Sequence, residues 1–154
     1  MLVALVGGGQ EEFGWRGWLQ PALQDHTSPL GAAVVVGLVW AVWHLPLFWL
    51  YGAYEQTVAL FYVPTLVGLS VIIALLWERS RQSVIVAIVL HASFNASGAL
   101  FVVGERAADP EVQFLAQGVL AAVTVALATV LAVRNGQQLR RPARVSRSRN
   151  RRPR

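Results

Sequence analysis

Three short clusters of polar side chains could do chemistry in a sequence that is otherwise very apolar. The clusters are Glu11, Glu12 and Arg16; then His44; then His91 and Asn95. A carboxylate, two imidazoles and an amide can together hydrolyse a bond. The carboxylate takes a proton from water, and one histidine holds that water or protonates the leaving amine. The other histidine and the amide donate hydrogen bonds to the oxyanion.

Spacing decides which of these side chains share a helix face. Glu12 and Arg16 are four residues apart, so they can form an ion pair on one face. Glu11 points about 100° away at 3.6 residues per turn, which leaves its carboxylate available as a general base. An interfacial helix with a surface salt bridge would have the same pattern, and the motif alone does not choose between the two.

The histidines also have neighbours on the same face. Trp40 precedes His44 by four residues, so the indole can pack against the imidazole, and Pro46 interrupts the helical hydrogen bonding nearby. His91 and Asn95 are spaced in the same way. Each pair also has a simpler interpretation. His44 can be a histidine that reaches the membrane interface, and the pair on the later segment can form hydrogen bonds that only join helices. Three clusters on separate apolar segments favour one shared pocket.

A metal site is an alternative for the same residues. Glu11, His44 and His91 have the ligand composition of some catalytic zinc sites, in which water takes the fourth position. The sequence lacks the HExxH motif, which places both histidines on one helix. Only the folded geometry can therefore decide between zinc and no cofactor.

The composition indicates where these residues work. Of the 154 residues, 55% are hydrophobic and 14% are charged, whereas a soluble domain has about 25% charged residues. The mean hydropathy is +0.50, and the six tryptophans suit the two interfaces of a bilayer. Cysteine is absent, which excludes disulfides and thiolate metal sites. We expect an integral membrane protein.

Four stretches are long and apolar enough to cross a bilayer, which takes about 20 residues in a helix. They are residues 29–50, 57–77, 83–103 and 112–133. Residues 1–23 should form a further helix, interrupted by three consecutive glycines, that is too short and too polar to span by itself. We predict an all-α fold, a multi-spanning transmembrane helix bundle, with one domain over residues 1–135.

The C-terminal tail, residues 136–154, carries most of the positive charge. All 13 basic residues are arginines, and eight of them lie between Arg140 and Arg154. Little in this tail can be buried, so we predict that it is disordered. Positive charge marks the cytoplasmic side of a membrane protein, which places the tail in the cytoplasm and residues 104–111 outside. Its expected neighbour is anionic membrane lipid, and nucleic acid is not an expected partner.

The three clusters, in this order and on apolar helices, resemble the CPBP family of intramembrane proteases. This family includes the type II CAAX prenyl endopeptidases and the bacterial Abi proteins. The resemblance covers about residues 5–100 and is carried by the strings EEFGWRGWLQPAL, WAVWHLPLF and WERSRQSVIVAIVLHASFN. Members usually have further membrane helices before EExxxR, and we expect these to be missing here. Trp40 stands where phenylalanine is more common and keeps a stacking face.

The resemblance implies an intramembrane endopeptidase in a bacterial cell membrane, acting on a peptide or protein substrate. It implies that Glu11 activates water and that His44 helps to hold this water. It also implies that His91 and Asn95 form the oxyanion site. The candidate catalytic residues are Glu11, Glu12, His44, His91 and Asn95, with Arg16 and Trp40 as structural support. The family was named as metalloproteases, so zinc remains an alternative to a metal-free mechanism.

Other functions fit the same residues. A non-catalytic membrane scaffold, or a bacteriocin-immunity-type protein, would keep the pocket without the reaction. A small transporter or proton relay would also place Glu and His side chains inside a membrane. The sequence identifies neither the substrate nor the oligomeric state.

Overall fold

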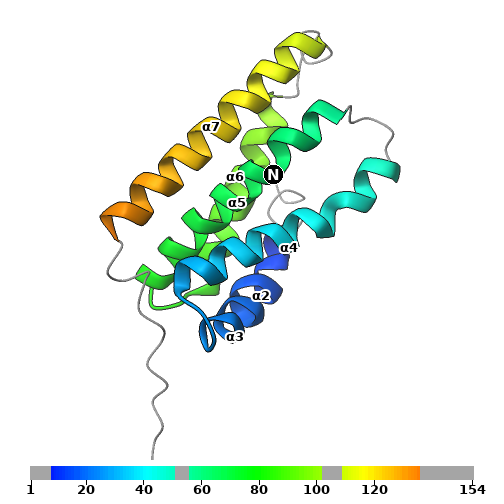
Figure 1. Ribbon diagram of the computed structural model, residues 1–154. Helices are drawn as coiled ribbons and strands as arrows, with labels where there is room; N and C mark the ends of the chain where they lie inside the picture. Colours follow the sequence, from blue (N-terminus) through cyan, green and yellow to red (C-terminus); the bar gives the residue numbers. More distant parts are fainter. Residues whose placement is uncertain (1–7, 51–55, 102–108, 136–154) are drawn as a thin grey trace, which may run out of the picture.

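The computed structural model describes residues 8–50, 56–101 and 109–135, and the regular structure in these ranges is helical (Figure 1). The long helices are α4 (Pro29–Leu50), α5 (Gln56–Arg79), α6 (Val84–Phe101) and α7 (Pro110–Arg134). Four short pieces precede them: η1 (Gly9–Glu11), α2 (Glu12–Gly14), η2 (Trp15–Leu19) and α3 (Gln20–Gln24). These pieces follow one another without a break, and we call residues 9–24 the N-terminal helix. The predicted all-α bundle is confirmed.

Local sequence signals explain where the helices begin. The Ser28 hydroxyl accepts a hydrogen bond from the Gly31 backbone N–H at 3.1 Å, and Pro29 is the first residue of α4. The Asp109 carboxylate accepts from the Glu111 N–H at 2.9 Å, again just before a proline at the first helical position. Both are N-caps, which satisfy N–H groups that the first helical turn leaves unpaired.

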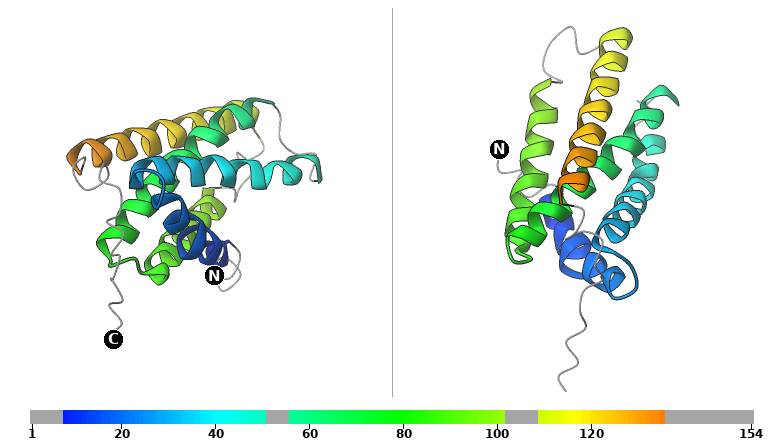
Figure 2. Two further views of the ribbon diagram at one scale, coloured as in Figure 1. Left: turned by 60° about the horizontal axis from the view of Figure 1, so that its bottom comes forward. Right: turned by 60° about the vertical axis from the view of Figure 1, so that its left-hand side comes forward.

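Helix α5 occupies the centre of the bundle. It packs against α4 on one side and α7 on the other, and it also contacts α6 (Figures 1 and 2). The N-terminal helix lies against α4 and α6 at one end. The main core cluster joins α4, α5 and α6 and consists of Trp40, Ala41, Leu66, Leu69, Ile73, Trp77 and Ala87. Trp40 of this cluster contacts both of the histidines described below.

Glycines allow α5 to approach both neighbours closely. A Cβ atom on Gly37 of α4 would lie 2.7 Å from the Val67 Cα atom of α5. A Cβ atom on Gly68 of α5 would lie 2.9 Å from the backbone carbon of Thr124 in α7. Small residues at such crossings let helix backbones pack together in membranes. The position of α4, which carries His44, therefore depends on Gly37.

The N-terminal helix presents a stripe of buried polar residues at four-residue intervals: Glu12, Arg16, Gln20 and Gln24. In a regular helix each four-residue step turns about 400°, so such a stripe would drift by about 40° per step. In η2 the Gln20 N–H bonds to the Trp15 carbonyl oxygen, five residues back. This wider π-type turn takes in more residues per turn and keeps the stripe facing the bundle.

Among the described residues, three helices are long and apolar enough to cross a membrane, over Pro29–Pro46, Leu60–Arg79 and Glu111–Arg134. These ranges match three of the four predicted spans. The third predicted span is a helix, but within the described residues its apolar part, Val84–Ser97, is shorter. The predicted disordered tail at 136–154 lies outside the described residues, as does most of the predicted loop at 104–111.

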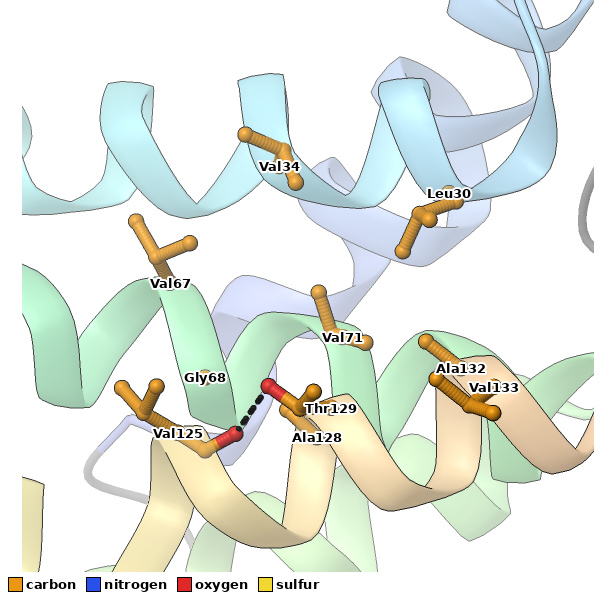
Figure 3. Close-up of a pocket in the computed structure, with 10 residues that line it drawn as sticks. All are labelled: Leu30, Val34, Val67, Gly68, Val71, Val125, Ala128, Thr129, Ala132 and Val133. Carbon is orange, nitrogen blue, oxygen red and sulfur yellow. Dashed lines mark hydrogen bonds between the residues drawn. The ribbon is translucent and has the colours of Figure 1, made fainter. Parts of the chain in front are cut away.

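An apolar groove of about 360 Å³ lies over α5, between α4 and α7 (Figure 3). Leu30 and Val34 line it from α4, and Ala128 and Val133 line it from α7. Its one side-chain hydroxyl, on Thr129, donates to the Val125 carbonyl oxygen of its own helix. None of its lining residues belongs to the three polar clusters, so the groove is separate from the candidate site.

Candidate active site

Glu12 is the centre of a buried ion network. Its carboxylate oxygens lie 3.1 and 3.0 Å from Arg16 Nη1, as the four-residue spacing predicted. The same carboxylate accepts a hydrogen bond from His91 Nδ1 at 2.9 Å, across the contact between the N-terminal helix and α6. The side chains of Glu12 and Arg16 are fully buried, and that of His91 is 2% exposed. The surface salt bridge considered above is therefore excluded.

Arg16 extends this network into the core. Its Nη2 atom donates to the Ser70 carbonyl oxygen at 2.7 Å and to the Ser70 hydroxyl at 2.9 Å. Burial lowers the pKa of the Arg16 guanidinium, and the neighbouring Glu12 carboxylate raises it. Arginine keeps its proton under such opposing influences. Arg16 therefore supplies the positive charge that compensates the buried Glu12.

Glu11 lies in a different environment from its neighbour. Its Oε1 atom is 4.0 Å from His44 Nε2, and the two side chains are 23% and 20% exposed, so the protein does not fully enclose either of them. The Trp15 indole N–H donates to Glu11 Oε2 at 3.3 Å. The geometry thus fixes one carboxylate oxygen and leaves the other facing a histidine.

The ring orientation of His44 is set by its own helix. Its Nδ1 atom lies 2.9 Å from the Trp40 carbonyl oxygen. Because a carbonyl oxygen can only accept, Nδ1 carries the proton of a neutral ring, and Nε2 is left as an acceptor. Two acceptors, His44 Nε2 and Glu11 Oε1, therefore face each other.

Gly8 brings the third cluster to the same place. Its φ of 99° is in a region that suits glycine. A Cβ atom here would overlap the Asn95 side-chain amide and would lie 3.1 Å from His91 Nε2. The Gly8 carbonyl oxygen also accepts from the Glu11 N–H at 3.0 Å. Asn95 and the outer nitrogen of His91 therefore lie beside Gly8, at the start of the backbone turn that leads to Glu11.

Trp40 packs between the two histidines. Its ring centroid is 4.6 Å from that of His91 and 6.2 Å from that of His44. The Tyr62 ring of α5 also contacts His44, at 6.0 Å between centroids. The structure thus brings Glu11, His44, His91 and Asn95 together, with Trp40 in contact with both imidazoles.

Sequence reasoning missed four contributors to this site. Gly8 had been noted only as an interruption of the helix, although its place just before two glutamates was a usable signal. Trp15, Tyr62 and Ser70 carried no signal of their own, because aromatic and small residues are common throughout apolar helices. Their parts depend on contacts between helices that spacing along one helix cannot show.

The described residues do not form a three-ligand metal site. No group of three His, Asp or Glu side chains among them is arranged to hold a metal ion. His91 already gives its Nδ1–H to Glu12, and its Nε2 atom faces the Gly8 backbone. Glu11, His44 and His91 therefore do not converge on one point as zinc would require.

Comparisons with known proteins find similarity to one family model and to one named relative. A family model described as "Type II CAAX prenyl endopeptidase Rce1-like" matches residues 1–97, the range that contains all of them. The chain is also 25% identical over 134 residues to "CAAX prenyl protease 2" of Methanococcus maripaludis. That match covers 82% of this chain and 48% of the relative, so the chain spans about half of the relative's length.

Proposed function

Because the chain belongs to the type II CAAX prenyl endopeptidase Rce1-like family, we propose that it is an intramembrane endopeptidase that hydrolyses a peptide bond of a membrane-associated peptide or protein. The family and the three apolar helices indicate an integral membrane protein. We infer in addition that the substrate is a CAAX-type C-terminal peptide, since the archaeal relative is named as a CAAX prenyl protease.

One observation carries the proposal: Glu11 Oε1 and His44 Nε2 face each other at 4.0 Å in a partly exposed site. That distance is too long for a direct hydrogen bond but suits one bridging water molecule. Water has two O–H groups, and both neighbours are acceptors, so it donates one to each and turns its lone pairs outward. Glu11 then takes the proton as the water attacks the carbonyl carbon, and it gives that proton to the leaving amine when the C–N bond breaks.

The oxyanion that forms needs hydrogen-bond donors. We assign this role to the Asn95 side-chain amide and to His91 Nε2, which lie together beside Gly8. To donate from Nε2 while Nδ1 donates to Glu12, the His91 ring must carry both protons. A cationic His91 and Arg16 would balance the carboxylates of Glu11 and Glu12, which makes the site neutral overall.

Two substrates and two variants test this proposal. A farnesylated CAAX peptide and an unmodified hydrophobic peptide would be incubated with the protein in liposomes, and the products identified by mass spectrometry. We expect Glu11→Gln to lower kcat by about 10³-fold, because loss of a general base costs between 10² and 10⁴. His44→Ala should lower kcat by about 10²-fold. Exposed His26→Ala is the matched control and should leave kcat unchanged.

Each outcome has a definite meaning. If the parent protein cleaves a peptide and the Glu11→Gln variant cleaves it equally well, the proposal is overturned. Activity that a chelator abolishes and added zinc restores would show that a metal takes part, against the ligand geometry described above. A parent that binds either peptide without cleaving it would favour the non-catalytic scaffold. Equal cleavage of both peptides would show that the substrate does not need a CAAX sequence, and it would still support the endopeptidase activity.

A further inference from the structure

Ser70 lies in the middle of an apolar helix, yet it makes three hydrogen bonds to other helices. Its side chain is fully buried. Its carbonyl oxygen and its hydroxyl oxygen both accept from Arg16 Nη2, at 2.7 and 2.9 Å. The hydroxyl proton goes to the Ala33 carbonyl oxygen of α4 at 2.7 Å. Ser70 thus joins α5 to the N-terminal helix and to α4 at one point.

The same bonds continue from Arg16 to the candidate site. While Nη2 is held at Ser70, Nη1 contacts both oxygens of the Glu12 carboxylate. A planar guanidinium fixed at two corners restricts the rotation of that carboxylate. The carboxylate in turn accepts from His91 Nδ1, and this bond fixes the direction of the ring. Nε2 of His91 then faces Gly8 and the site.

We propose that Ser70 is a positioning residue: it holds Arg16 so that Glu12 aims the His91 imidazole at the substrate. Its effect on catalysis rests on the function proposed above, whereas its effect on His91 does not. The position also requires a small side chain. Ser70 Cβ lies 3.0 Å from where a Cβ on Gly37 would be, in the close crossing of α4 and α5.

The orientation of His91 can be measured without a substrate. The chain has three histidines, so protein labelled with ¹⁵N-histidine gives a simple NMR spectrum in detergent micelles, and His91 is assigned by the signal lost in His91→Gln. We expect a low-field Nδ1–H proton for His91 in the parent. In Ser70→Ala, Arg16 keeps the carbonyl contact of residue 70 but loses the hydroxyl contact, so the Glu12 carboxylate is less firmly held. The Nδ1–H proton of His91 should then move upfield and exchange faster with water.

Two further variants separate positioning from packing. Ser70→Cys keeps an atom at the γ position, but sulfur accepts a hydrogen bond from Arg16 only weakly. This variant should repeat the NMR change, and it keeps the test open if Ser70→Ala does not fold. Thr124→Val removes a buried hydroxyl that bonds only within α7 and should leave His91 unchanged. An unchanged His91 signal in both Ser70 variants would overturn the proposal.

Kinetics add a second readout. With a cleaved peptide as substrate, Ser70→Ala should lower kcat by about tenfold and change KM by less than about twofold, because the contact acts on the transition state. A general loss of folded protein would instead lower the active fraction and the melting temperature, as any packing defect does. If the parent cleaves nothing, the proposed function fails, and the NMR comparison still decides the role of Ser70.

Discussion

Two adjacent glutamates occupy opposite kinds of environment in this protein. Glu12 is fully buried and paired with a guanidinium and an imidazole. Glu11 is partly exposed and faces His44 across a gap suited to one water molecule. A carboxylate that is fully paired is a structural ion, whereas one with a free oxygen near water can act as a base. We therefore propose different roles for the two residues, a structural ion for Glu12 and a general base for Glu11.

The buried ion pair gives a stability prediction. Arg16→Met should lower the free energy of unfolding by about 3–5 kcal/mol, because it leaves Glu12 buried without its countercharge. The double variant Arg16→Met with Glu12→Gln should regain part of that loss, since no charge is then left uncompensated. Denaturation in detergent would measure both values. Arg134→Met, which changes an exposed arginine, is the control, and a loss equal to that of Arg16→Met would contradict the argument.

At the scale of the helices, the crossing of α4 and α5 decides whether His44 meets Glu11. At this crossing Gly37 packs against the backbone of α5, at the Val67 Cα atom. Backbone atoms cannot turn aside as a flexible side chain can, so any added atom must push the helices apart. Because His44 lies on α4, a shift of α4 away from α5 would also move His44 relative to Glu11.

We therefore expect Gly37→Ala to destabilise the protein by about 1–3 kcal/mol, as overpacking of a core does, and to reduce cleavage more than binding. Gly14→Ala is the matched control, because a Cβ atom there meets nothing within 4 Å. In a helix that substitution should stabilise by about 0.5–1 kcal/mol. Thermal melts of the two variants in one detergent would compare them directly, and equal effects would argue against the crossing.

At the scale of the whole molecule, contacts between helix ends define one end of the bundle. Arg79 at the end of α5 donates to the Asn135 side chain at the end of α7. Gln24, at the end of the N-terminal helix, donates to Glu78 at 2.6 Å. These contacts place the turn before α4, the turn after α5 and the end of α7 on one side. By the distribution of arginines, we propose that this side is cytoplasmic.

Single cysteines can test this topology, because the parent has none. In sealed inverted vesicles, a membrane-impermeant maleimide should label Cys introduced as His26→Cys or Ser80→Cys. It should leave Glu111→Cys, at the start of α7, unlabelled until the vesicles are opened. The opposite pattern would reverse the proposed orientation, and labelling of all three sites would contradict the spans.

Much of this architecture could be predicted from the sequence, for identifiable reasons. The limits of α4 matched those predicted because a serine cap and a proline mark its start, and the Glu12–Arg16 pair followed from helix spacing alone. The bond from Glu12 to His91 could not be predicted, because it joins residues 79 apart in sequence. The third predicted span was longer than the apolar part that the structure describes. Hydropathy reflects the composition of a helix but not which other helices it packs against.

The polar stripe of the N-terminal helix has a consequence for biogenesis. Glu12, Arg16 and Gln24 leave the ribosome before their partners on α5 and α6, which lie 54 to 79 residues further along the chain. Until α5 and α6 have been inserted, these polar groups lack the partners that the two helices supply, and they are too costly to bury in lipid. The segment that bears the two glutamates is therefore synthesised early and docks late. If the proposed function is correct, we expect proteolysis to begin only after this docking, because Glu11 belongs to the segment that docks late.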